Sequence, residues 1–423
     1  MRSVGVLSLG CKVNTYESEF VINELKKAGY EIKDFNEVCD VYIINTCTVT
    51  NQSDAKSKKM IRQAIRRNPN ACVVAMGCFI AANLDIQIDG LDIIIGNKDK
   101  SRIVELLDEY FKNKEVMRLE YTGRIKEFED MYINNFPGRT RAFVKIQDGC
   151  DNFCTFCIIP FVRGKCRSKD EEEVIKEITD LVKHGYKEVV LTGIHTGSYG
   201  EDLETSFADL LKKLVKIEGL ERLRISSIET TELGEDVLDV LKNSHVLVDH
   251  LHIPIQAGSN EILKAMNRKY DLDYFFNKIE EIREIRPNIS ISTDVIVGFP
   301  GESEELFQQT IDTCKKIGFS KLHVFPYSER RGTAASRMDN KLDNGVKKNR
   351  ARRLIKVSEE LEKEYMKKFL GCDVDVLIEE YKDGYSFGHT GNFLYVKINR
   401  ELPHNEIVKV KIKDIEYPYV IGE

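Results

Sequence analysis

Three cysteines in the middle of the chain, Cys150, Cys154 and Cys157, lie close enough in sequence to bind one metal centre. Thiolates are the ligands that iron–sulfur clusters take, and this spacing lets three of them surround one cluster. Three ligands leave the fourth iron of a four-iron cluster open, and that iron can chelate the amine and carboxylate of S-adenosylmethionine. Zinc is the alternative, but zinc sites usually have a fourth Cys or His at short spacing, and only Cys166 is near. We therefore favour a four-iron cluster.

The cysteine loop follows the first of a series of predicted strand–helix units. Short runs rich in β-branched residues predict strands at 142–147, 188–192, 222–227, 250–255, 290–297 and 321–326. Amphipathic patterns predict helices between them at 171–183, 207–216, 233–242, 274–285 and 304–317. This series predicts a partial (βα)6 barrel, a relative of the eight-unit fold. The three cysteines then lie at the carboxyl end of a barrel strand, where such folds place their chemistry.

Three cysteines nearer the amino terminus, Cys11, Cys47 and Cys78, each come shortly after a predicted strand. Strands are predicted at 4–9, 41–45, 71–76 and 92–96, and helices at 17–28, 55–67 and 101–112. This alternation predicts a parallel, doubly wound sheet, in which the carboxyl ends of neighbouring strands lie side by side. The three thiolates should then converge on one site; chance is the alternative, because cysteine spacing alone is a weak signal. The remaining cysteines have no such pattern: Cys39, Cys72, Cys166, Cys314 and Cys372.

The carboxyl-terminal part of the chain changes character. A charged helix is predicted at 346–369, and strands follow at 373–378, 393–398 and 407–412, with Gly384, Gly388 and Gly391 as turn residues. This pattern predicts a small β-barrel. The chain is therefore predicted to be α/β overall, with four segments: a parallel-sheet domain at 1–114, a linker at 115–138 that contains Pro137, the partial barrel at 139–368 and the small β-barrel at 369–423.

The net charge and the local charge of the chain point in opposite directions on whether the partner is a nucleic acid. The 423 residues carry a net charge of −6, which argues weakly against nucleic acid, but local basic stretches argue for it. Basic side chains gather on the predicted helix at 55–67, around the cysteine loop and after the sixth barrel strand: Lys56, Lys58, Lys59, Arg62, Arg66, Arg67, Arg139, Arg141, Arg163, Lys165, Arg167, Arg330 and Arg331. They either hold phosphates or form solvated surfaces. No membrane span or secretory signal is visible, so we expect a cytoplasmic protein.

The cysteine loop, with Phe156 before its last cysteine, resembles the radical S-adenosylmethionine superfamily. The resemblance continues at the ends of later barrel strands. It implies that Thr192 and Gly193 contact the methionyl amine and that Gln256 holds the ribose. It also implies that the motif at 294–302, which includes Asp294, Val297 and Gly298, meets the adenine through its backbone. Each of these matches is weak alone, and their order along successive strands makes them strong together.

Three segments carry the amino-terminal cysteines and resemble the methylthiotransferase family: 9–19, 45–50 and 76–78. The resemblance to this family covers essentially the whole chain. The resemblance implies a second four-iron cluster on Cys11, Cys47 and Cys78, and a carboxyl-terminal RNA-binding β-barrel called TRAM. The segment at 9–19 is most similar to members that act on N6-threonylcarbamoyladenosine beside the transfer RNA anticodon.

The resemblance implies an enzyme that adds a methylthio group to C2 of N6-threonylcarbamoyladenosine at position 37 of tRNA. A radical is needed because an aromatic C–H bond has no acidity that a base could use. S-adenosylmethionine would be the source of this radical and also the methyl donor. The second cluster would hold the sulfur. The expected partners are the tRNA anticodon stem-loop, an electron donor such as flavodoxin or ferredoxin, and a sulfur donor, with no membrane and a monomer or weak dimer.

Two other functions are open. One is the same chemistry on another substrate, either isopentenyladenosine in tRNA or an aspartate of a ribosomal protein. The other is a non-catalytic iron–sulfur protein that binds RNA as a sensor. The matches at Gln256 and 294–302 argue against a sensor, because a sensor needs no adenosyl pocket.

Overall fold

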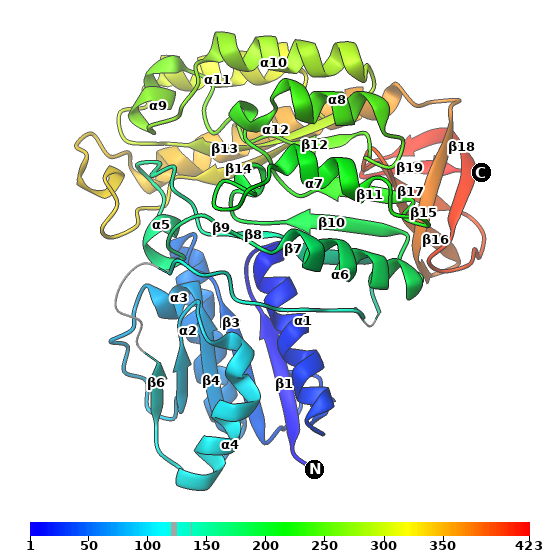
Figure 1. The fold of residues 1–423 in the computed structure, drawn as a ribbon. Helices are drawn as coiled ribbons and strands as arrows, with labels where there is room; N and C mark the ends of the chain where they lie inside the picture. The colour runs from blue at the N-terminus through cyan, green and yellow to red at the C-terminus, as the bar shows by residue number, and fades with distance from the viewer. Residues whose placement is uncertain (120–124, 137) are drawn as a thin grey trace.

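The computed structural model describes residues 1–119, 125–136 and 138–423. Residues 120–124 and Pro137, which the sequence assigned to the linker, lie outside the described part. Figure 1 shows three regions: a sheet with its helices in blue and cyan, a larger half-open barrel in green and yellow, and a small β-barrel in red at the carboxyl terminus. The predicted α/β organisation is therefore confirmed.

The amino-terminal region is a six-stranded parallel sheet in the order β2-β1-β3-β4-β5-β6. Its strands are β1 Ser3–Ser8, β2 Glu31–Lys33, β3 Val41–Thr46, β4 Cys72–Gly77, β5 Ile93–Ile95 and β6 Met117–Leu119. Its helices are α1 Lys12–Lys27, α2 Asn51–Arg67, α3 Cys78–Ala81, η1 Lys100–Arg102 and α4 Ile103–Asn113. The central strands β3 and β4 are buried at every residue, as expected for parallel strands covered on both faces.

Two predictions for this region were wrong in detail. Helix α1 begins at Lys12, not at residue 17, because Asn14 and its neighbours are used for buried polar contacts and show no apolar period. Residues 117–119 were assigned to the linker but form β6, which pairs with β5 at the edge of the sheet. A three-residue edge strand is too short for an alternating pattern to be seen in the sequence.

The middle region contains six parallel strands in two sheets, ordered β11-β10-β7 and β12-β13-β14. The strands are β7 Arg141–Lys145, β10 Glu188–Thr192, β11 Arg222–Ile225, β12 His250–His252, β13 Ser290–Val297 and β14 Lys321–Pro326. The helices are α5 Ile159–Val162, α6 Glu171–Lys183, α7 Phe207–Leu214, α8 Glu235–Asn243, α9 Asn260–Ala265, α10 Leu272–Ile285 and α11 Glu304–Ile317. Short pieces are β8 Gln147–Asp148, β9 Arg167–Ser168, η2 Thr196–Ser198, η3 Thr230–Glu232 and η4 Ala335–Arg337. The Ile228 amide donates to the His252 carbonyl (3.0 Å) and links the two sheets, so the predicted partial barrel is confirmed.

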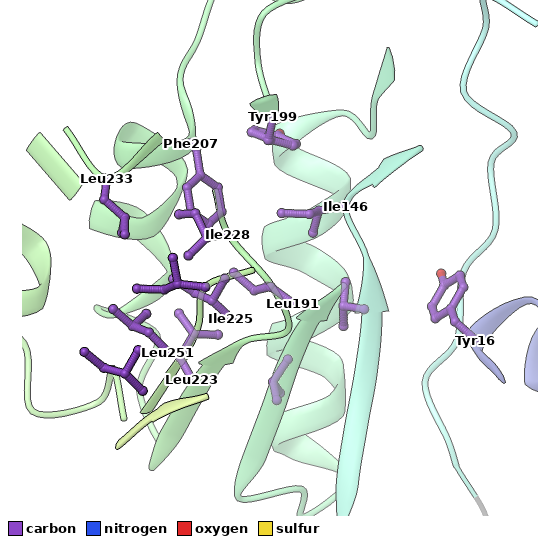
Figure 2. Close-up of a cluster of buried hydrophobic side chains, with 14 of the residues drawn as sticks. Tyr16, Ile146, Leu191, Tyr199, Phe207, Leu223, Ile225, Ile228, Leu233 and Leu251 are labelled. Atoms are coloured by element: carbon purple, nitrogen blue, oxygen red, sulfur yellow. The ribbon is translucent and has the colours of Figure 1, made fainter. Parts of the chain in front are cut away.

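One apolar core connects the sheet region to the barrel. Figure 2 shows Leu191, Leu223 and Leu251 packed between barrel strands and helices, with Tyr16 of α1 on the far side of β7. Each fully buried side chain of this kind contributes about 1.5–3 kcal/mol. The Tyr16 hydroxyl donates to the Met131 carbonyl (2.7 Å), so α1 is bound to the segment that precedes the barrel. The two regions therefore share a continuous interior rather than a thin contact.

The carboxyl-terminal helix α12 Asn344–Lys367 leads to a closed barrel in the order β15-β16-β17-β19-β18. Its strands are β15 Asp373–Lys382, β16 Tyr385–Thr390, β17 Tyr395–Ile398, β18 Ile407–Glu416 and β19 Tyr419–Gly422. Gly388, predicted as a turn residue, lies inside β16, where a Cβ atom would lie 2.1 Å from the Leu377 carbonyl oxygen. It is glycine because neighbouring backbone is close, not because the chain turns. No helix in the described part of the chain is long and apolar enough to cross a membrane.

Candidate metal sites and the cavity between them

The barrel site is formed by Cys150, Cys154 and Cys157, on the loop after β8. The loop enters through Gly149, whose φ is +76° and where a Cβ atom would lie 1.8 Å from the Lys165 carbonyl oxygen. Only glycine can therefore start this loop. Backbone hydrogen bonds then hold it: the Cys150 amide donates to Gly164 (3.2 Å) and the Cys157 amide to Cys154 (3.0 Å).

The thiols of the barrel site suit the cationic iron–sulfur core of a cluster. Burial raises the pKa of Cys157 to about 12 and raises that of Cys150 further, so they need a nearby positive charge to ionise. Arg268 donates from Nη1 to Cys154 Sγ (3.3 Å), and its guanidinium is paired with Glu229. No three His, Cys, Asp or Glu side chains of the described residues converge enough to hold a single metal ion. A four-iron cluster binds each thiolate on a different iron, so the donor set fits it.

The residues predicted to hold S-adenosylmethionine lie at the carboxyl ends of three barrel strands. Thr192 ends β10, and the Gln147 side chain accepts the amides of the two residues after Gly193, at 3.0 and 2.8 Å. A side chain at Gly193 would approach Gln147 to 3.0 Å, so glycine keeps this strand end open.

Gln256 and the fifth-strand motif lie together along β13. Gln256 has φ +65° and is bonded into β13: its amide donates to the Asp294 carbonyl (2.9 Å) and its carbonyl accepts from Ile296 (2.8 Å). Val297 ends β13 and is fully buried. Gly298 has φ +73° and donates its amide to Glu302 Oε2 (2.7 Å). The two backbone hydrogen bonds to Asp294 and Ile296 hold Gln256 beside β13 in a conformation that non-glycine residues rarely adopt.

The N-terminal site is formed by Cys11, Cys47 and Cys78, which follow β1, β3 and β4. Cys11 caps α1 and Cys78 begins α3. At Gly10, a Cβ atom would lie 2.8 Å from Cys47 Sγ, so glycine lets the first two strand ends approach. Burial raises the pKa of the Cys47 thiol, and the nearby Cys78 thiol raises it further, whereas Cys11 is exposed. The structure thus brings together three cysteines that are 36 and 31 residues apart in sequence.

A cavity of about 1750 Å³ opens between the N-terminal site and the barrel. Cys11 and Cys47 line one side of it, and residues after β14 together with the start of α12 line the other. Phe161 (62% exposed) and Phe325 (44% exposed) present aromatic rings at its wall. Its basic lining residues are Arg330, Arg331, Lys341, Lys347 and Lys348. Four carboxylates also line it: Asp54, Asp85, Glu329 and Asp343. The cavity has the size and the aromatic rings to hold a nucleotide that has left its stack.

The cavity wall is fastened across the two regions beside Cys47. Arg330 Nη2 donates to Thr48 Oγ1 (2.8 Å) and to Asp54 Oδ2 (2.6 Å). The Asn51 amide donates to the Ser328 hydroxyl (2.9 Å). Arg330, which the sequence analysis counted among possible phosphate contacts, is therefore used to hold the loop after β14 against α2.

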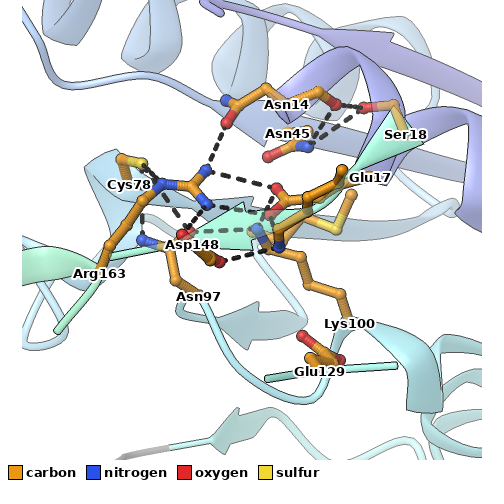
Figure 3. Close-up of polar contacts among 12 residues, drawn as sticks. Asn14, Glu17, Ser18, Asn45, Cys78, Asn97, Lys100, Glu129, Asp148 and Arg163 are labelled. Carbon is orange, nitrogen blue, oxygen red and sulfur yellow. Dashed lines mark hydrogen bonds and ion pairs between the residues drawn. The ribbon is translucent and has the colours of Figure 1, made fainter. Parts of the chain in front are cut away.

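A buried ion network joins the N-terminal site to the barrel, and the sequence analysis missed it (Figure 3). The network consists of two carboxylates and four cations: Glu17, Asp148, Lys100, Lys145, Arg163 and Arg167. The side chains of Arg163 and Arg167 are at most 1% exposed, so for these two residues both alternatives, a phosphate contact and a solvated surface, were wrong. The contacts of Arg163 with Glu17 and Asn14 span more than a hundred residues of sequence, and no local pattern could have revealed them.

Comparison with known proteins agrees with this geometry. Residues 144–314 match the model of the radical SAM superfamily, and residues 3–96 match that of the uncharacterized protein family UPF0004. Threonylcarbamoyladenosine tRNA methylthiotransferase MtaB of Bacillus subtilis is 44% identical, over 100% of this chain and 96% of the relative. The Aquifex aeolicus protein of the same name is 40% identical, over 88% and 92%. tRNA-2-methylthio-N(6)-dimethylallyladenosine synthase of Carboxydothermus hydrogenoformans is 36% identical, over 89% and 88%.

Solved structures agree on the fold. The radical S-adenosylmethionine methyltransferase TsrM of Kitasatospora setae superposes with a TM-score of 0.55 at 14% identity, over 77% of this chain and 73% of that one. The radical enzyme OxsB superposes with a TM-score of 0.52 at 13% identity, over 86% and 56%. At such identities the likeness concerns the fold alone, whereas the sequence relatives extend over the whole chain. The chain therefore belongs to the tRNA methylthiotransferase family of radical SAM proteins.

Proposed function

We propose that this protein is a radical SAM methylthiotransferase that adds a methylthio group to C2 of N6-threonylcarbamoyladenosine at position 37 of tRNA. The observation that carries the proposal is the cavity that has Cys11 and Cys47 on one wall and barrel residues on the other. A base in this cavity would be within reach of both regions, as a reaction that uses a radical and a sulfur group requires.

Membership of the radical SAM superfamily implies S-adenosylmethionine and one four-iron cluster. We propose that Cys150, Cys154 and Cys157 hold that cluster and that a second four-iron cluster is held by the N-terminal site. When bound, these groups supply the radical that removes hydrogen from C2 and the methylthio group that replaces it. S-adenosylmethionine would also supply the methyl group.

The chain's own residues bind and orient. Thr192 and Gly193 would receive the methionyl amine, and Gln256 the ribose. The adenine would meet the backbone of β13 and the turn after it, at Val297 and Gly298. At Gly298 a Cβ atom would lie 2.3 Å from Lys347 Cγ, so another residue would have to displace the Lys347 side chain and adopt a strained φ of +73°. Asp294 lies 3.3 Å from His252 Nε2, which fixes its carboxylate inside the barrel.

The charge of the cavity favours threonylcarbamoyladenosine over dimethylallyladenosine. The threonyl group carries a carboxylate, whereas the dimethylallyl group is apolar and uncharged. Among the described residues, Arg331, Lys347 and Lys348 line the cavity without a carboxylate partner, and Lys341 is paired with Glu329. These cations would gain no charge interaction with an apolar dimethylallyl group, whereas they would attract the carboxylate of the threonyl group.

The remaining features of the proposal concern the setting of the reaction. The protein would act in the cytoplasm, as a monomer or weak dimer, on the anticodon stem-loop. It would take electrons from a donor such as flavodoxin or ferredoxin and sulfur from a separate donor. The segments at 139–368 and 369–423 would act as the radical domain and the TRAM-like RNA-binding domain, after an amino-terminal domain at 1–114 extended by β6.

The test is anaerobic incubation of the reconstituted protein with S-adenosylmethionine, a reductant and tRNA, followed by mass spectrometry of the nucleosides. We expect methylthiolation of tRNA that carries threonylcarbamoyladenosine and little of tRNA that carries isopentenyladenosine. The triple change Arg331→Ala, Lys347→Ala and Lys348→Ala should reduce the preference for tRNA that carries threonylcarbamoyladenosine. Lys278→Ala, which changes a residue outside the cavity lining, should leave this preference unchanged. Equal activity on both tRNAs would contradict the proposed substrate, and no deoxyadenosine at all would favour a sensor.

A further inference from the structure

Cys78 of the N-terminal site is contacted by a side chain from the barrel. Arg163 lies just after α5 and donates from Nε to Cys78 Sγ at 3.3 Å (Figure 3). Asn97, from the loop after β5, donates from Nδ2 to the same sulfur at 3.5 Å. The Cys78 sulfur therefore accepts two hydrogen bonds, one from each region of the molecule.

The guanidinium of Arg163 cannot turn away from this position. Its Nη1 donates to Glu17 Oε1 and to Asp148 Oδ1, both at 3.0 Å, and its Nη2 donates to Asn14 Oδ1 at 2.8 Å. The side chain is completely buried. Arginine is a planar fork of donors, so holding both ends of the fork fixes the third direction toward sulfur.

The buried ion network carries more positive than negative charge. Four cations face Glu17 and Asp148 directly, and the Glu129 carboxylate also interacts with Lys100 and Lys145, so one positive charge exceeds the negative ones. A cluster held by three thiolates carries a net negative charge, and its reduction adds one more. Charged donors next to a cluster's thiolates stabilise the more negative, reduced form and raise the reduction potential.

We infer that Arg163 is a positioning residue of the N-terminal metal site, which orients Cys78 and raises the reduction potential of the cluster bound there. The inference rests on the proposed second cluster. It also connects the two sites, because Arg163 follows Cys157 of the barrel site with only α5 between them. Movement of the barrel loop would therefore be transmitted to a ligand of the other cluster.

The test measures the potential of the N-terminal cluster alone. The full-length chain with Cys150→Ala, Cys154→Ala and Cys157→Ala provides the background, so that one cluster contributes to the electron paramagnetic resonance signal. Arg163→Gln removes the charge and leaves one amide nitrogen in place of three donor nitrogens, whereas Arg163→Lys keeps the charge. The matched control is Lys145→Gln, which removes a buried cation that pairs with the same two carboxylates, at 3.0 and 2.8 Å, rather than with a cysteine sulfur.

We expect the midpoint potential to shift to more negative values in Arg163→Gln, to shift less in Arg163→Lys, and to move least in Lys145→Gln, although all three lose thermal stability. If Arg163→Gln fails to fold, Arg163→Lys and Asn97→Ala should still shift the potential in the same direction. Wild-type potentials in the Arg163 variants, or an equal shift in Lys145→Gln, would overturn the inference. Absence of any cluster in the background protein would instead contradict the proposed second cluster.

Discussion

The barrel site and the N-terminal site each consist of three cysteines, but the fold brings the two sets together in different ways. The barrel site takes its cysteines from one loop, and the loop is held by the barrel's own residues, such as Arg268 on Cys154. The N-terminal site gathers Cys11, Cys47 and Cys78 from three strand ends and receives a donor from the barrel. The comparison shows that a local site can be recognised from spacing, whereas a dispersed site requires the sheet topology.

The dependence between the two sites runs from the N-terminal site to the barrel. The N-terminal site is completed by Arg163, a barrel residue, whereas the contacts found for the barrel cysteines come from the barrel. Damage to the N-terminal site should therefore leave the barrel competent, and damage at their interface should affect both regions.

The largest expected effect comes from the barrel site. Changing Cys150, Cys154 and Cys157 to Ala together should reduce the iron content from about eight atoms to about four and abolish S-adenosylmethionine cleavage, because three ligands of one four-iron cluster are lost. Iron analysis and chromatography of deoxyadenosine measure the two effects. Unchanged iron would mean that these cysteines are not ligands.

The reciprocal change tests the direction of dependence. Cys11→Ala, Cys47→Ala and Cys78→Ala together should leave deoxyadenosine formation but give no methylthio product, because the radical at the base would find no sulfur group. Mass spectrometry of tRNA nucleosides, beside the deoxyadenosine measurement, separates the two activities. Continued methylthiolation would show that the sulfur comes from elsewhere.

At the interface, Glu17→Gln should lower the free energy of unfolding by about 3–5 kcal/mol, because it leaves buried cations without their partner. Glu17 is 1% exposed and pairs with Lys100, Lys145 and Arg163. The control is Glu24→Gln, which breaks an exposed pair with Lys27 and should cost about 0–1 kcal/mol. Urea unfolding measures both, and equal effects would show that the ion network does not couple the regions.

Acid should weaken the same interface. Burial opposes ionisation of Glu17, but Arg163 and Lys100 outweigh it and hold the pKa of this carboxyl below its usual range. A carboxyl whose pKa is lower in the folded state stabilises the fold above the unfolded pKa, and this stability is lost as the pH falls. The melting temperature should therefore fall below about pH 4, near the unfolded pKa of glutamate. Glu17→Gln should flatten this part of the pH profile, and an unchanged profile would contradict the assignment.

The smallest expected effect concerns RNA. Lys58, Lys59 and Arg62 are exposed on α2, next to the N-terminal site. Changing them to Ala should weaken tRNA binding and reduce the salt dependence by roughly one log–log slope unit per lost phosphate contact. Filter binding at several salt concentrations measures the slope. S-adenosylmethionine cleavage without RNA is the internal control, and unchanged affinity would favour a solvated helix face.

The sequence allowed prediction of those features that repeat or lie close together. Strand β10 and helices α6 and α11 have the predicted bounds, because their buried faces follow regular periods. Cys11, Cys47 and Cys78 could be placed together because parallel strands have a common edge. Arg163 could not be assigned, because its partners Asn14 and Glu17 are nearly 150 residues away and a buried arginine looks like any other basic residue in sequence.

The shared ion network limits how the chain can be divided. A fragment that ended after β6 would keep Glu17 and Lys100 but lose Lys145, Asp148 and Arg163. It would also expose the α1 face that now packs on the barrel, including the Tyr16 hydroxyl bonded to Met131. The two halves consequently cannot be exchanged as separate modules between relatives, and a substitution at the α1 face has to be matched by one in the barrel.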